Sequence, residues 1–149
     1  ETGITNYEMI EELYKASIAG VKIEMIVRGI CCLIPGNSEF SKNIEAKSIV
    51  DKYLEHTRFF IFCSGGENKT YISSADWMTR NLDNRIEVTC PILEPYNKKE
   101  ILEIFNIYWL DNLKSRKLNS SLINEYSKNA KETLQSQNSV YNYYLKIFF

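Results

Sequence analysis

The sequence contains a single histidine, His56, at a position where it could bind an anion. Histidine is the side chain whose ordinary pKa lies nearest neutral pH, so it can both give and take a proton. An apolar run, Phe59–Phe62, follows it and is typical of a buried strand. A second short apolar run ends at Ser73-Ser74-Ala75-Asp76, seventeen residues after the histidine. The two segments could converge on one anion, and the alternative is that His56 is structural.

Arg28 is a second candidate for anion binding. The alternating residues of 21–27 predict an interior strand, and Arg28-Gly29 closes its carboxyl end. Ligands of open α/β sheets usually bind at the carboxyl ends of strands. A planar guanidinium can also donate two parallel hydrogen bonds to a phosphate. The alternative is a surface ion pair between Arg28 and Glu24 or Glu55.

Other polar residues near the two apolar runs have simpler interpretations. Arg58 and Lys69 flank the predicted central strands and are expected to be solvated charges at strand ends. Ser73 and Ser74 could donate their hydroxyls to a phosphate. They could equally be small side chains that a tight strand end requires.

Two arginines lie around the turn that follows the Ser-Ser-Ala-Asp segment. Arg80 and Arg85 could bond Asp76 or Asp83 and thereby hold that turn. Such contacts would support a ligand site from outside without touching the ligand.

Length and charge narrow the class of protein. With 149 residues, 44% hydrophobic and 25% charged, the chain fits one globular domain. A net charge of −1 argues against broad nucleic-acid binding, which needs a basic surface. No apolar stretch approaches the roughly 20 residues that span a bilayer, and no signal peptide begins the sequence. We therefore expect a cytoplasmic location, with membrane association left open.

The four cysteines do not form a metal-binding pattern. Cys31, Cys32, Cys63 and Cys90 include no CxxC pair, and a single histidine cannot complete a zinc site of the usual kind. Their apolar neighbours predict buried, reduced thiols.

Strands alternate with helices along the chain, which predicts an α/β layered domain. Gly20 ends the first helix, Pro91 stops the last strand, and Asn97-Lys98-Lys99-Glu100 has the form of a helix start. The predicted helices are 7–19, 43–54, 77–82 and a deeply packed 101–113; the strands are 21–27, 59–62, 70–73 and 85–90; a surface loop 128–139 precedes a final amphipathic segment 140–149.

Four blocks of sequence resemble one known family. They are Arg28–Leu33, Ser48–His56, Tyr71–Asp83 and Arg85–Val88. In this order and at this spacing they resemble the type 1 polyphosphate kinases of bacteria. The likeness runs from the first helix to about residue 118. It resumes weakly at Gln135-Ser136-Gln137, where the family often has a Ser-Gln pair before its last helix.

The resemblance is to the last domain of that enzyme, one of two phospholipase-D-like halves. It implies that residues 1–149 form such a half, a mixed sheet flanked by helices, with 119–149 as a C-terminal helical extension. It also implies a kinase that reversibly moves the terminal phosphate of ATP onto polyphosphate through a phosphohistidine in the preceding half. Glu1-Thr2-Gly3 lacks an initiator methionine, so the chain looks like a piece of a longer polypeptide. Because the nucleophilic histidine would lie in the preceding half, this chain alone is expected to be inactive.

The resemblance implies roles for particular residues. Arg28 and His56 would contact the phosphates of ATP or ADP, and His56 would also serve as proton donor or acceptor. Ser73, Ser74, Asp76 and Arg80 would support the site. No metal ligand is expected in this chain, because the Mg²⁺-binding segment of the family lies outside it. ATP, polyphosphate, the preceding domains and further copies of the enzyme would be the partners.

Two rival functions remain open at this point. The phospholipase-D motif has His-x-Lys, a later Asp and Gly-Ser-x-Asn. Here Arg58 replaces the lysine, Cys63 stands near the Asp position, and Ser73-Ser74-Ala75-Asp76 replaces the last motif. These departures weaken the case for a phosphodiesterase. The other rival, a non-catalytic module for phosphate binding or subunit contact, is separated only by a binding measurement.

Overall fold

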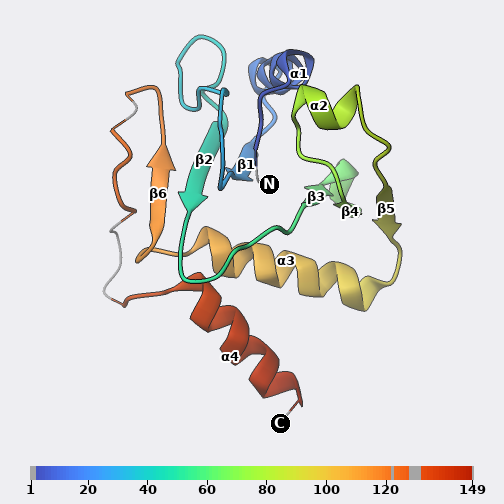
Figure 1. The fold of residues 1–149 in the computed structure, drawn as a ribbon, viewed down its shortest axis with the longest axis vertical. Coiled ribbons are helices and arrows are strands. Elements are labelled where there is room, and N and C mark those ends of the chain that lie inside the picture. The colour runs from blue at the N-terminus through green and yellow to red at the C-terminus, as the bar shows by residue number, and fades with distance from the viewer. Residues whose placement is uncertain (1–2, 122, 128–131, 149) are drawn as a thin grey trace.

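Two three-stranded sheets and four α-helices make up the computed structural model, which describes residues 3–121, 123–127 and 132–148. The sheets lie beside each other, with α1 at one end of the molecule and α3 running beneath both (Figure 1). The prediction of a mixed α/β fold is confirmed, although its strands form two sheets. The elements in order are α1 (Tyr7–Ile18), β1 (Ile23–Ile26), β2 (Ile44–Ile49), β3 (Phe59–Phe62), a 3-10 turn (Ser64–Gly66), β4 (Lys69–Ser73), α2 (Thr79–Leu82), β5 (Thr89–Ile92), α3 (Pro95–Trp109), β6 (Ser115–Leu118) and α4 (Ser136–Phe148).

The first sheet has the order β1-β2-β6, with β1 parallel and β6 antiparallel to β2. The helix predicted for residues 43–54 is wrong, because β2 occupies its first half and an irregular segment its second. Ile44 and Ala46 are buried against α1 on one face of β2, whereas Ile49 lines a cavity. A strand that buries apolar residues on both faces lacks strict alternation, and here its spacing imitated a helix.

The second sheet, β3-β4-β5, is antiparallel throughout. Strands β3 and β4 lie where the apolar runs predicted them. The third strand comes later than predicted: Pro91 lies inside β5, opposite Tyr71, instead of stopping the strand. An edge strand tolerates proline, because the missing N–H can face away from the neighbouring strand.

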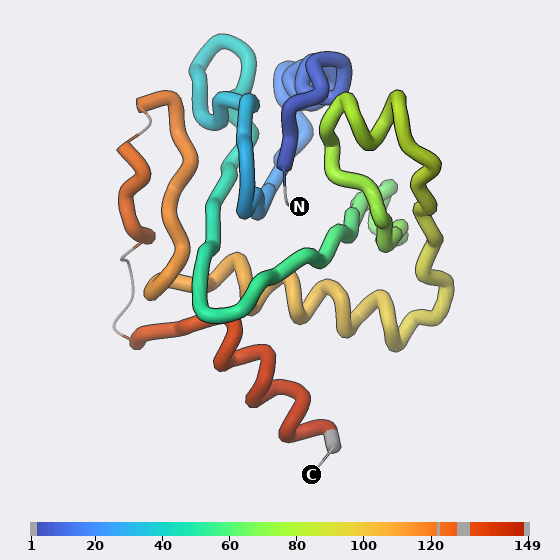
Figure 2. Tube along the Cα trace, in the orientation of Figure 1, coloured from blue at the N-terminus to red at the C-terminus, as the bar shows by residue number. Residues whose placement is uncertain are grey.

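Residues 3–6 connect the two sheets. Ile4 N donates to the carbonyl of Ile30, and Cys32 N donates to the carbonyl of Ile4, at 2.9 Å each. On the other side, Thr5 N and Asn6 N both donate to the carbonyl of Trp77. The segment therefore lies between the chain after β1 and the chain after β4, as Figure 2 shows. The side chain of Ile4 is fully buried.

Helix α1 packs on the first sheet and begins as its sequence dictates. Asn6 is the N-cap, and its side chain accepts a hydrogen bond from Met9 N at 2.9 Å. Gly20, with φ of 94°, ends the helix as predicted. Ile10 faces the core, whose buried residues are Ile4, Ile10, Met25, Val27, Leu33, Ile44 and Ala46.

The last two helices differ from the sequence-based prediction. Helix α3 begins at Pro95, whose fixed φ suits the first helical position, and not at Asn97. None of its residues is fully buried, so it is less deeply packed than its composition indicated. Helix α4 begins at Ser136 inside the predicted loop 128–139, of which residues 128–131 lie outside the described part of the chain. No helix in the described residues is long and apolar enough to cross a membrane.

Candidate functional site

His56 lies in the irregular connection between β2 and β3, two residues before a nearly buried arginine. Its imidazole is exposed, and its Nε2 lies 3.2 Å from Nη2 of Arg58. The ring is therefore in hydrogen-bond contact with the fold while one side of it remains open to a ligand.

Arg58 forms an ion pair with Asp76, which corrects its interpretation as a solvated charge. Nε of Arg58 donates to Oδ1 of Asp76 at 2.7 Å, and the side chains are only 10% and 8% exposed. The antiparallel pairing of β3 with β4 explains the contact, because it brings the residue before β3 next to the chain after β4. Ser73 N extends this ladder by donating to the Arg58 carbonyl at 2.9 Å. Arg58, and not the exposed Arg80, thus holds Asp76.

The hydroxyls of Ser73 and Ser74 are engaged in holding the turn. Ser73 Oγ accepts from Ala75 N at 3.1 Å and lies 2.8 Å from the hydroxyl of Thr89. Ser74 Oγ accepts from Val88 N at 3.0 Å and donates to the carboxylate of Glu87. These bonds favour the architectural interpretation over direct donation to a ligand.

Glu87 is a member of this cluster that the sequence did not single out. Its carboxylate accepts hydrogen bonds from Ser74 and, at 2.7 Å, from Nδ2 of the buried Asn81. These two bonds hold the pKa of Glu87 below its ordinary value. In the sequence, the only pointer to Glu87 was its place in the block Arg85–Val88. No rule of sequence spacing pairs it with the distant Ser74, which it contacts in the fold.

Arg28 follows β1, as predicted, and is half-buried. Its Nε is buried and has no hydrogen-bond partner, and Arg28 forms no ion pair within the described residues. The expected alternative partner Glu24 pairs with Lys22 at 2.7 Å instead. A desolvated donor without an acceptor is a position at which an anion could bind.

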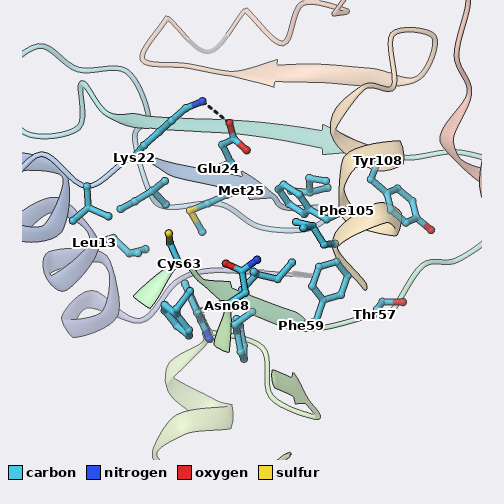
Figure 3. A pocket seen from close by; sticks show the side chains of 18 of the residues that line it. Leu13, Lys22, Glu24, Met25, Thr57, Phe59, Cys63, Asn68, Phe105 and Tyr108 are labelled. Atoms are coloured by element: carbon cyan, nitrogen blue, oxygen red, sulfur yellow. Dashed lines mark ion pairs between the residues drawn. The ribbon is translucent and has the colours of Figure 1, made fainter. Parts of the chain in front are cut away.

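A cavity of about 810 Å³ lies between the two sheets and has mainly apolar walls. Arg28 lines it, together with Glu55 and Thr57, the two neighbours of His56. Figure 3 shows Phe59 and Phe105 on one wall, where their rings meet edge to face at 6.3 Å. That one phosphate meets both Arg28 and His56 stays a prediction.

Tyr108 of α3 anchors the histidine segment to the wall of the cavity. Burial raises the pKa of Tyr108, and a hydrogen bond with Glu55, the residue before His56, raises it further. The phenol therefore stays protonated and available to this carboxylate at neutral pH.

The thiols and carboxylates of the site do not converge on a metal. Within the described ranges no three His, Cys, Asp or Glu side chains are grouped so that they could hold an ion. All four cysteines are free thiols, but the prediction that they are buried is wrong for three of them, since Cys32, Cys63 and Cys90 are exposed. Cys31 is half-buried, and burial raises its pKa.

Comparison with known proteins gives the site a family context. Residues 3–137 match the family model described as polyphosphate kinase C-terminal domain 2. The polyphosphate kinase of Escherichia coli K12 is 46% identical over 136 residues, which are 91% of this chain and 20% of that protein. That of Halalkalibacterium halodurans is 48% identical over 136 residues, 90% of this chain and 19% of the relative.

A solved structure agrees with these sequence matches. The crystal structure of polyphosphate kinase from Porphyromonas gingivalis superposes with a TM-score of 0.95 at 45% identity. The superposition covers 98% of this chain and 22% of that one. The chain therefore spans about a fifth of the length of the proteins that it matches.

Proposed function

Because the chain belongs to the polyphosphate kinase family, we propose that it forms a C-terminal domain of an enzyme that reversibly transfers the terminal phosphate of ATP to polyphosphate. Residues 1–149 would be one phospholipase-D-like half, with 119–149 as its helical extension. The rest of the polypeptide would supply the phosphohistidine, the adenine site and the Mg²⁺ ligands. The intact enzyme would be a cytoplasmic homo-oligomer.

Arg28 supplies the observation that carries this proposal. Phosphoryl transfer asks a protein mainly for positioning and for neutralisation of charge. The buried Nε of Arg28 lacks an acceptor, and leaving such a donor unpaired costs about 1–3 kcal/mol. A phosphate oxygen entering the cavity would offset that cost. The guanidinium would then bind the nucleotide phosphates through charge-assisted hydrogen bonds.

His56 would contact the same phosphates and take part in their proton transfers. Its two neighbours in sequence, Glu55 and Thr57, line the cavity, which supports a role for this segment beside the phosphates. Asp76, Ser73 and Ser74 would act indirectly by holding Arg58 and the turn. Arg80 would contribute positive charge from α2.

Substitutions in the intact enzyme that carries this chain test the proposal. Arg28→Ala should lower both nucleotide affinity and kcat, and Arg28→Lys should not restore them, because an ammonium lacks the planar fork. His56→Ala should slow the chemical step by about 10²–10⁴-fold. Lys15→Ala is the matched control, since it removes an exposed positive charge on α1 outside the cavity.

Two outcomes would contradict the proposal. Unchanged KM for ATP and unchanged kcat in Arg28→Ala would exclude the phosphate contact. The second outcome comes from incubating the 149-residue chain with γ-labelled ATP. We expect this chain to acquire no stable label. Label on His56 would show that this chain carries the nucleophile.

A further inference from the structure

One guanidinium, that of Arg58, contacts both His56 and Asp76. Its Nε donates to Oδ1 of Asp76 at 2.7 Å, and its Nη2 lies 3.2 Å from Nε2 of His56. The two charged side chains are nearly buried, whereas the imidazole is exposed. The ion pair is thus fixed in the fold and can hold the exposed ring in one orientation.

Arg58 also determines which ring nitrogen carries the hydrogen. A guanidinium has five N–H donors, no acceptor, and stays protonated in proteins. Nε2 of His56 must therefore present its lone pair to Nη2, which leaves the hydrogen on Nδ1. We propose that Arg58, held by Asp76, is a positioning residue that fixes His56 as the neutral Nδ1–H tautomer.

The tautomer limits which hydrogen bonds His56 can form with a ligand. With Nε2 engaged, Nδ1 is the ring nitrogen left to face the ligand, and it is a donor. His56 would bind a phosphate oxygen as a neutral hydrogen-bond donor, and the ring would have to leave Arg58 before it could hold two protons. The assignment rests on the proposed function only for the identity of the acceptor, because the tautomer is a property of this chain.

The sequence makes the tautomer directly measurable, because His56 is its single histidine. A two-bond ¹H–¹⁵N correlation spectrum of the ¹⁵N-labelled 149-residue chain distinguishes the two tautomers. At about pH 8.5, two units above the ordinary pKa of histidine, we expect the Nδ1–H form to predominate. A spectrum of the Nε2–H form in the unsubstituted chain would overturn the proposal without any variant.

A double variant shows whether Arg58 is the cause. Arg58→Met with Asp76→Asn removes both charges together, so that neither is left buried and unpaired. The ring should then adopt the Nε2–H form that an unrestrained imidazole favours in water. Arg80→Met, which removes an exposed arginine from α2, should keep the Nδ1–H form.

The two proposals fail in different ways. If the double variant keeps the Nδ1–H form, Arg58 does not set the tautomer and the inference is wrong. If His56→Ala leaves the intact enzyme fully active, the proposed function of His56 is wrong, while the tautomer measurement stands unaffected.

Discussion

Asp111, which follows α3, is 1% exposed and joins the end of that helix to β6 and α4. Its Oδ1 accepts hydrogen bonds from Leu113 N, Lys114 N and Ser115 N at 2.7–3.0 Å, at the start of β6. Its Oδ2 accepts from Ser136 N, the first residue of α4, at 2.7 Å. Burial works to raise the pKa of Asp111, but the hydrogen bonds from Ser136, Lys114 and Ser115 outweigh it, and the pKa lies below its ordinary value.

Asp111 should give the chain a stability that depends on acid pH. A carboxyl whose pKa is depressed on folding stabilises the protein fully above its unfolded pKa, here 3.8, and that contribution is lost as pH falls through the folded pKa. We expect Asp111→Ala to lower the free energy of unfolding at pH 7 by about 3 kcal/mol, because buried N–H groups lose their acceptor. Urea unfolding measured between about pH 2 and 7 should show a weaker acid dependence in this variant. An unchanged dependence would mean that other carboxyls govern it.

Single residues also show which contacts of the site cannot be predicted from the sequence. Arg28 and His56 could be proposed because their types and strand-end positions are local features. The Arg58–Asp76 pair could not, since it depends on the register of β3 against β4, eighteen residues apart in sequence. The exposed cysteines were missed for the same reason, because burial depends on what the fold packs over each position.

The elements were predictable where their patterns are local. Helix α1 has a cap, an amphipathic repeat and a terminal glycine, and strands β3 and β4 are short apolar runs. Strand β2 was mistaken for a helix because it is covered on both faces. Strand β6, Ser115–Leu118, was missed altogether, since two of its four residues are basic and its pairing with β2 is what makes it a strand.

Helix α4 holds the segment that carries His56. The side-chain amide of Gln137 accepts from Tyr53 N at 3.0 Å and donates to the Tyr53 carbonyl at 2.8 Å. Gln135 donates to Asp51 at 2.6 Å in the same segment. The start of α4 therefore acts on a stretch of chain more than eighty residues away, only three residues before His56.

Gln137→Ala should therefore displace His56 without unfolding the chain. We expect kcat of the intact enzyme to fall by up to about 10²-fold, because His56 is proposed to act in the transfer and small displacements of a reacting group carry large rate costs. Asn142→Ala, which removes an exposed amide from the same helix, should leave kcat unchanged. Equal rates in the two variants would show that the Tyr53 contact does not position the histidine.

At the scale of the whole molecule, Ile4 joins the two sheets. Its backbone pairs with the chain beside Cys31 on one side, and it also forms a bridge with Trp77. Ile4→Ala should lower the free energy of unfolding by about 2–5 kcal/mol, the usual cost of truncating a fully buried isoleucine. Urea unfolding of the 149-residue chain measures this change. Ile18→Ala, at a position that is 62% exposed, should cost far less, and equal costs would contradict the contribution assigned to the buried Ile4 side chain.

The two edge strands of the second sheet differ. At β5, Pro91 lacks an N–H, so another chain cannot complete a ladder there. The other edge strand is β3, which consists of four consecutive apolar residues without proline or charge. Its last residue, Phe62, is 54% exposed. Strands of this kind recruit other chains into aggregates when their edges come within reach. We therefore expect β3 to be the edge of this sheet at which chains associate during refolding.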